Sequence, residues 1–163
     1  MKEITQFMFE RSKPRTKVYL MCGLPGSGKS EWCKRNHPEL PIVSRDIIRG
    51  ELGFTSGVDE KARLENWQEN KVTEKEKEYI KRYIKQHQDF IIDDTNLRLK
   101  YRKQMIQSLR DLGAYIIGVR IDTPLELCIK RRDGQINSER MEDISRKMTP
   151  LEKDEVDELI IVK

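Results

Sequence analysis

The chain has 163 residues, of which 36% are hydrophobic and 37% charged, and it carries a formal net charge of +4. The length fits one compact domain, and no apolar stretch approaches the roughly 20 residues that span a bilayer, so we expect no membrane segment or signal peptide. The charge suits an anionic partner but is too small to separate a nucleic acid from a nucleotide or a phosphorylated metabolite.

The cysteines Cys22, Cys33 and Cys128 are odd in number and lack the paired spacing of a zinc site. We therefore expect free thiols in a reducing cytoplasm and no disulfide-linked partner. A polar and basic lead-in precedes the first apolar run, so residues 1–16 are predicted to be a loosely held arm and residues 17–163 a single domain.

Apolar runs alternate with helical periods along this domain, which predicts a parallel sheet covered by helices on both faces. The first strand is expected at 17–22, and a helix at 29–36 follows a glycine-rich turn and ends before Pro38. A short second strand is expected at 41–44. A long helix is predicted at about 63–86, because apolar residues recur there close to helical spacing.

The second half of the chain continues this alternation. A third strand is expected at 90–93, and the next helix runs through 105–112 and is closed by Gly113 at its C-terminal cap. The fourth strand is predicted at 114–121, and 159–162 is a candidate edge strand. The central parallel sheet is therefore expected to have about five strands.

A four-residue pattern, Thr-Pro-Leu-Glu, occurs twice, at 123–126 and at 149–152. Threonine as N-cap, proline at the first helical position and a glutamate reaching back are typical of a helix start. The pattern therefore predicts a capped helix from Thr123. No other self-similarity accompanies it, so it does not indicate an internal repeat.

The most informative motif lies at 23–30, where GLPGSGKS satisfies the P-loop pattern G-x-x-x-x-G-K-[ST] between a predicted strand and a predicted helix. Glycines permit the turn that aims backbone N–H groups at a phosphate, and the helix N-terminus adds partial positive charge. We expect Lys29 to bridge the β- and γ-phosphates of ATP and Ser30 to ligate Mg²⁺. The predicted nucleotide-binding residues are Gly23, Leu24, Pro25, Gly26, Ser27, Gly28, Lys29, Ser30 and Glu31.

A P-loop alone does not distinguish a kinase from a GTPase, a motor or a nucleotide-gated module. The guanine-specific N-K-x-D pattern is missing, because Asn70 and Lys71 are followed by Val72 and Thr73, and the chain is short for a motor domain. These observations favour an α/β P-loop kinase fold, with a central parallel sheet flanked by helices and a small lid.

A candidate acceptor side follows the second predicted strand, at the edge where open α/β sheets bind ligands. Asp46 could accept the proton of an attacking hydroxyl and help order Mg²⁺, and Arg49, one turn later, could hold an anionic group of the acceptor. Alternatively, Asp46 only caps a helix that begins at Ile47. The residues themselves leave both interpretations open.

A second acidic segment, 93–97, ends the third predicted strand, where P-loop enzymes usually keep an acid near Mg²⁺. Asp94 is therefore a candidate metal ligand, although Asp, Thr and Asn side chains at this place are also typical helix caps. A basic cluster follows and could either guide a polynucleotide backbone or form a solvated helix face. Its members are Arg98, Lys100, Arg102 and Lys103.

Two arginines, Arg131 and Arg132, follow the predicted fifth helix and precede an Asp-Gly turn signal that suits a hinged lid. Lid arginines stabilise the negative charge that spreads over a transferring phosphoryl group, so both are predicted to be catalytic. Arg140 or Arg146 could serve instead. The pair could also only stabilise a helix C-terminus.

Together these segments resemble the 5′-polynucleotide kinases of bacteriophage type and the kinase domains of end-healing RNA repair enzymes. The match runs over most of the chain after the basic arm, and it is specific through the order and spacing of its parts. They are 23–30 with Trp32, 44–46 with Arg49, 93–97, and 130–132. The relatives usually carry a longer segment with a further arginine after the last part, and this chain is shortened there.

The resemblance implies that Asp46 is the general base and that Arg49 binds the phosphate next to the 5′-hydroxyl of the acceptor nucleotide. It implies ATP-dependent phosphorylation of a polynucleotide 5′-hydroxyl, on RNA or DNA. The predicted acceptor-binding residues are Arg45, Arg49, Thr95 and Asn96, and the predicted metal ligands are Ser30, Asp46 and Asp94. The alternatives are a small-molecule kinase, for a nucleoside, sugar or antibiotic, and an ATP-binding regulatory protein with weak transfer.

Overall fold

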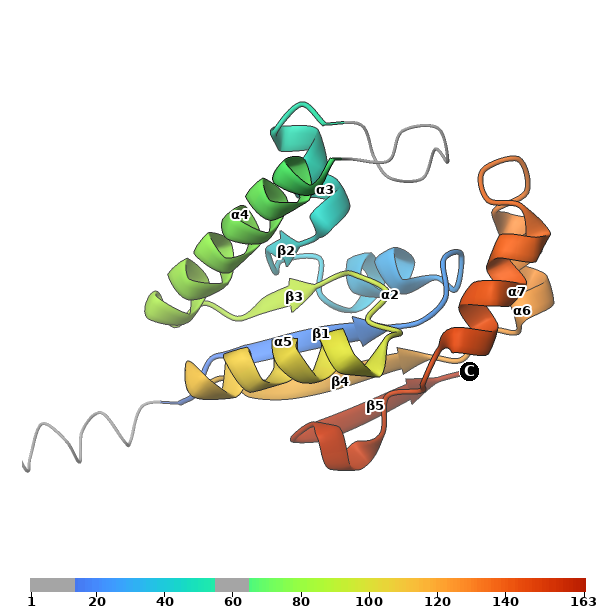
Figure 1. Ribbon diagram of the computed structural model, residues 1–163. Helices are drawn as coiled ribbons and strands as arrows, with labels where there is room; N and C mark the ends of the chain where they lie inside the picture. Colours follow the sequence, from blue (N-terminus) through green and yellow to red (C-terminus); the bar gives the residue numbers. More distant parts are fainter. Residues whose placement is uncertain (1–13, 55–64) are drawn as a thin grey trace, which may run out of the picture.

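The computed structural model describes residues 14–54 and 65–163. These residues form a five-stranded sheet with helices on both faces (Figure 1). Most of the predicted arm at 1–16, and the first residues of the helix predicted at 63–86, lie outside the described residues. The predicted α/β class is confirmed.

The sheet has the strand order β2-β3-β1-β4-β5, and all four pairings are parallel. The first strand therefore lies at the centre, and its carboxyl end is flanked by the ends of β3 and β4. The predicted fifth strand is confirmed as an edge strand. The strands are β1 (Lys17–Cys22), β2 (Ile42–Val43), β3 (Phe90–Ile92), β4 (Tyr115–Ile121) and β5 (Glu158–Val162).

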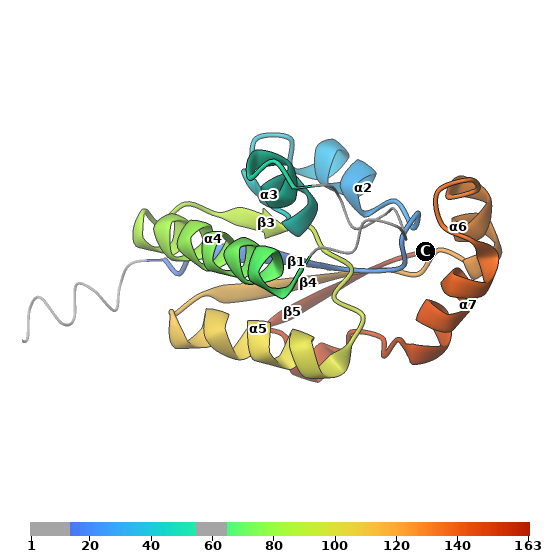
Figure 2. The same ribbon diagram turned by 45° about the horizontal axis from the view of Figure 1, so that its top comes forward.

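The two faces of the sheet are covered by different helices, as the alternation along β1 shows. Leu20 packs in the cluster that holds buried side chains of α4 and α5, whereas Met21 packs with Cys33 of α2 on the opposite face. Figure 2 shows α4 and α5 side by side and α6 and α7 beyond the carboxyl ends of the strands. The helices are α2 (Lys29–Asn36), α3 (Arg45–Glu51), α4 (Asn66–Lys85), α5 (Leu99–Asp111), α6 (Leu125–Arg131), α7 (Ser138–Lys147) and the 3-10 turn η1 (Lys153–Glu155).

Two predicted helix starts are wrong in detail. The helix expected from Ile47 begins at Arg45 with Ser44 as N-cap, so Asp46 lies inside its first turn and is not the cap. The helix expected from Thr123 begins at Leu125, and the Thr123 hydroxyl donates instead to the Ser27 backbone oxygen, 2.6 Å away. A long-range partner thus outcompetes the local capping bond.

Helix α7 was not expected from the sequence, although its signals are present. Asn137 caps it by accepting from the backbone N–H of Arg140, 2.8 Å away, and Met141 is its buried contact with the core. The polar residues between these two hide the helical period. None of the helices in the described part of the chain is long and apolar enough to cross a membrane.

Candidate active site

The P-loop connects β1 to α2 and is shaped by glycines with positive φ. Gly26 has φ 78° and Gly28 has φ 101°, and a Cβ atom at Gly26 would lie 2.9 Å from the backbone oxygen of Cys128. Larger residues therefore do not fit at this position. The Ser27 hydroxyl is buried and has no hydrogen-bond partner among the described residues, which leaves a donor inside a loop built for phosphates.

Lys29 folds its side chain back over the loop. The Nζ atom donates to the backbone oxygens of Gly23 and Leu24 at 3.0 and 2.9 Å. Burial lowers the pKa of this ammonium, and the nearby Asp93 carboxylate opposes that shift. The loop thus holds a cation and an unsatisfied hydroxyl next to a helix N-terminus, which fits a nucleotide phosphate group.

A serine and an aspartate meet at the first turn of α2. Ser30 Oγ donates to Asp93 Oδ2 at 2.8 Å, because the carboxyl ends of β1 and β3 are neighbours. Within residues 14–54 and 65–163, no group of three or more acidic, histidine or cysteine side chains is arranged to hold a metal ion. A hydroxyl and one carboxylate nevertheless fit Mg²⁺, which takes its other ligands from water and substrate phosphates.

Sequence reasoning chose Asp94 as the metal ligand and missed Asp93. Successive residues after a strand point to opposite faces, so Asp93 faces α2 and Ser30, whereas Asp94 faces α3 and accepts from the Arg45 backbone N–H at 3.0 Å. Burial, with the Glu76 carboxylate nearby, raises the pKa of Asp94 to about 7. The pairing of β3 with β1 was the signal that could have found Asp93.

Helix α3 carries the expected base and the expected anion-binding arginine. Asp46 Oδ1 accepts from Arg49 Nη1 at 2.7 Å, and the Asp46 side chain is 62% exposed. Glu69 of α4 accepts from Arg49 Nε and Nη2 at 3.1 and 3.2 Å. The guanidinium plane is therefore fixed on two sides, and Asp46 keeps access to solvent.

Arg45 serves as a brace between α3 and α4. Its guanidinium donates to Glu69 at 2.7 Å and to Glu76 at 3.0 Å, and a third bond reaches the Thr73 hydroxyl at 3.1 Å. Its charge is thus compensated by two carboxylates of α4. The position explains the residue structurally, without a contact to an acceptor.

The predicted lid arginines lie above the P-loop. Arg131 Nη1 donates to the Gly26 backbone oxygen at 3.1 Å, and Arg132 donates to Gln135 at 2.8 Å. Both line a cavity of about 1130 Å³, which Arg140 also lines. Arg146 instead forms an ion pair with Asp143 along α7, and its side chain is 74% exposed.

The same cavity brings together most of the predicted site. Besides the lid arginines it is lined by Gly26, Ser27, Gly28, Lys29, Ser30, Glu31, Arg45, Asp46, Arg49, Asp93, Asp94 and Thr95. Four segments far apart in the sequence thus contribute to one space at the carboxyl ends of the strands. The arrangement can hold a nucleotide triphosphate on one side and present a carboxylate and an arginine on the other.

Two polar residues near this cavity hold backbone instead. Asn96, with φ 48°, donates to the Met21 backbone oxygen at 2.7 Å, and the Gly23 N–H donates to the Thr95 oxygen at 3.1 Å. These bonds tie the segment after β3 to the P-loop. Thr95 is exposed and lines the cavity, whereas Asn96 is used for support.

Arg102 departs from the solvated basic cluster expected around it. Its side chain is fully buried and donates to both carboxylate oxygens of Glu155, at 2.9 and 3.0 Å. It also donates to the backbone oxygens of Asn96 and Thr149 at 2.9 and 2.7 Å. Arg102 therefore cannot guide a polynucleotide, because it joins the segment after β3 to the C-terminal part of the chain.

Comparisons with known proteins agree with this geometry. A family model described as an AAA domain matches residues 18–151. A Pnkp1/Rnl/Hen1 complex has a chain that is 25% identical with a TM-score of 0.64, and the match covers 74% of this chain and 40% of that one. In the Pnkp1/Rnl/Hen1 RNA repair complex the identity is 22%, the TM-score 0.69 and the coverage 88% and 50%.

Kinases for other acceptors have the same fold. An APS kinase from Mycobacterium tuberculosis, in complex with AMPPNP and APS, is 18% identical with a TM-score of 0.58, and the match covers 91% of this chain and 90% of that one. A putative kinase from Chloroflexus aurantiacus is 17% identical with a TM-score of 0.66, with coverage of 91% and 85%. None of the curated proteins matches this chain in sequence.

The chain spans half or less of the two repair-complex chains that it matches. The resemblance to RNA repair kinases expected from the sequence is confirmed at the level of the family and fold. Because the family model covers most of the chain, from the first strand to the segment after α7, this chain belongs to the AAA-domain family and has its P-loop kinase fold.

Proposed function

We propose that this protein transfers the γ-phosphate of ATP to the 5′-hydroxyl of a polynucleotide, RNA or DNA. The observation that carries the proposal is the exposed Asp46 carboxylate, bonded to Arg49 in the cavity that Lys29 and the P-loop also line. A base beside a cation is the arrangement that an anionic hydroxyl acceptor needs.

On the donor side, the P-loop N–H groups and Lys29 hold the phosphates, and Ser30 with Asp93 holds Mg²⁺. The metal ion, when bound, neutralises charge on the phosphates. The Lys29 ammonium must leave the Gly23 and Leu24 backbone oxygens to reach a phosphate, which a flexible lysine stem permits. Arg131 and Arg132 add positive charge from above.

On the acceptor side, Asp46 takes the proton of the attacking hydroxyl as its bond to phosphorus forms. Glu69 engages Nε and Nη2 of Arg49 and so turns the remaining N–H groups of its fork toward the cavity. An internucleotide phosphate beside the 5′-hydroxyl is an anion that these groups can bind. A nucleoside without a phosphate would leave them unpaired.

The RNA repair complex among the neighbours supports the polynucleotide acceptor. A small-molecule acceptor is the second candidate, favoured by the match to the APS kinase over nearly the full length of both chains. The Arg49 site distinguishes the two only if the small acceptor lacks an anionic group.

An acceptor panel tests the proposal. The protein is incubated with Mg²⁺, γ-labelled ATP and 5′-hydroxyl oligoribonucleotides, oligodeoxyribonucleotides, nucleoside 3′-monophosphates, nucleosides and sugars. We expect label on the oligonucleotides. Label confined to small acceptors would establish the second candidate, and ATP binding without any labelled acceptor would indicate a regulatory protein.

A further inference from the structure

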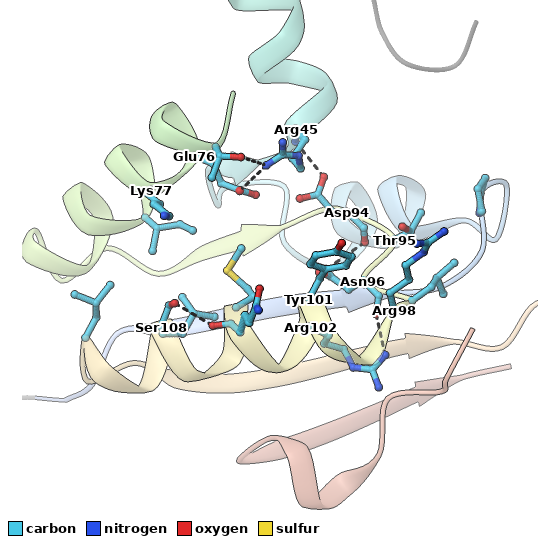
Figure 3. Close-up of a pocket in the computed structure, with 18 of the residues that line it drawn as sticks. Arg45, Glu76, Lys77, Asp94, Thr95, Asn96, Arg98, Tyr101, Arg102 and Ser108 are labelled. Atoms are coloured by element: carbon cyan, nitrogen blue, oxygen red, sulfur yellow. Dashed lines mark hydrogen bonds and ion pairs between the residues drawn. The ribbon is translucent and has the colours of Figure 1, made fainter. Parts of the chain in front are cut away.

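A second cavity, of about 1050 Å³, lies between α4 and α5 beside the candidate active site (Figure 3). We call it the α4–α5 groove. It is continuous with the active-site cavity, because both are lined by Pro25, Arg45, Asp94, Thr95 and Ile144. A chain-like substrate whose end lies at Asp46 therefore has a path out of the active site along this groove.

The walls of the groove carry exposed positive charge. Lys77 and Lys81 line it from α4, and Arg98 lines it from the start of α5; all three are exposed. The deeper cations do not add to this charge, because Arg45 is paired with Glu76 and Arg102 with Glu155. The exposed lysines and arginine thus favour an anionic ligand that runs along the surface.

An aromatic side chain stands at the end of the groove nearest the active site. Tyr101 is 60% exposed, and Figure 3 shows it projecting from α5 toward the loop that carries Asp94 and Thr95. The floor below is apolar, with Leu97 and Met105 among its lining residues. An exposed ring over an apolar floor, flanked by cations, is the surface on which a base stacks and a phosphate is neutralised.

We propose that the α4–α5 groove binds the nucleotides on the 3′ side of the acceptor nucleotide as a single strand. Tyr101 stacks on a base, and Lys77, Lys81 and Arg98 lie along the phosphates. The proposal rests on the proposed function, since it requires a polynucleotide acceptor. It adds a binding site on α4 and α5 that the P-loop, Asp46 and Arg49 do not include.

Two measurements test the groove. Fluorescence anisotropy gives the affinity for a labelled eight-nucleotide strand, and labelled ATP gives kcat/KM for that strand and for a nucleoside 3′-monophosphate. In Tyr101→Ala we expect binding of the strand to weaken by about 5- to 100-fold, and the ratio of the two kcat/KM values to fall in proportion. Tyr101→Phe keeps the ring and should restore both.

Charge variants provide the matched control. Replacing Lys77 and Lys81 together by glutamine should lower the slope of log affinity against log salt by about 1.4. Lys85→Gln removes the same charge from an exposed position of α4 that does not line the groove, and it should leave the slope unchanged. Thermal melting of each variant checks that it is folded.

The outcomes separate the groove from the proposed function. Phosphorylation of strands with neither a Tyr101 effect nor a Lys77/Lys81 effect on binding would overturn the groove alone. Strand binding that depends on Tyr101, with no acceptor labelled, would support the groove and overturn the proposed function. Equal losses for the strand and the mononucleotide would also overturn the groove, because Tyr101 would then act at the first nucleotide or through the fold.

Discussion

At the scale of single residues, Asp46 is the position on which the proposed chemistry depends. Asp46→Asn preserves the shape of the side chain but cannot take the hydroxyl proton. We expect kcat to fall by roughly a hundred- to ten-thousandfold, while the KM for ATP stays near its original value. Steady-state kinetics with the best acceptor of the panel measure both. Asp154→Asn, an exposed carboxylate in η1, is the control. An unchanged kcat in Asp46→Asn would show that another group is the base.

The two adjacent carboxylates after β3 can be separated by their metal dependence. Asp93 contacts Ser30, whereas Asp94 contacts the Arg45 backbone, so only Asp93 lies on the metal side of the loop. We expect Asp93→Asn to raise the Mg²⁺ concentration needed for half-maximal rate by about tenfold or more. Asp94→Asn should change it less. The reverse order would restore Asp94 as the metal ligand that the sequence suggested.

These two residues also show where sequence reasoning stops at this scale. The pattern of an apolar strand followed by acids identified the segment, and the P-loop lysine and serine were found from their motif alone. Choosing between Asp93 and Asp94 requires the pleat and register of β3 against β1, which are long-range properties.

At the scale of elements, the basic helix α5 divides into a buried and a solvated side. Arg102→Met removes a buried cation together with its bonds to Glu155, Asn96 and Thr149. We expect the free energy of unfolding to fall by about 3 kcal/mol, because Glu155 keeps an unpaired charge. Urea denaturation measures the change. Lys103→Met, at an exposed position on the same helix, should stay within about 0.5 kcal/mol.

A second-site change sharpens this prediction. Adding Glu155→Leu to Arg102→Met removes the stranded carboxylate, so part of the lost stability should return. If Arg102→Met had no more effect than Lys103→Met, Arg102 would be solvated, as the charge pattern alone suggested. The sequence could not tell these arginine and lysine side chains apart, because the partner of Arg102 lies 53 positions away.

Element boundaries followed the sequence wherever local signals acted alone. The strand 17–22 and the helix 29–36 occur as predicted, because an apolar run, the P-loop glycines and a proline define their limits locally. The prediction failed at Thr123, whose hydroxyl bonds to Ser27 instead of capping α6. The second Thr-Pro-Leu-Glu pattern opens no α-helix either, since Leu151 is fully buried and only η1 follows.

At the scale of the whole molecule, the strand order explains why one cavity gathers residues from four segments. With β1 at the centre, the P-loop, the acids after β3 and the lid after β4 all leave the sheet at the same edge. The sequence predicted these strands but not their order, which depends on pairings between distant residues. A ligand that contacts several of these segments should therefore stabilise the entire fold.

Binding of a nucleotide tests this coupling directly. With the non-hydrolysable analogue AMPPNP and Mg²⁺ at about 100 times the dissociation constant, stability should rise by about 2.7 kcal/mol, or roughly 5–10 °C in Tm. Lys29→Ala should lose most of this shift, whereas Lys34→Ala, an exposed lysine on the same helix, should keep it. Chelation of Mg²⁺ should reduce the shift in the wild-type protein, because phosphate charge then remains uncompensated beside Asp93. An equal shift in Lys29→Ala would mean that the nucleotide is held elsewhere, and the cavity above the P-loop would then lose its donor side.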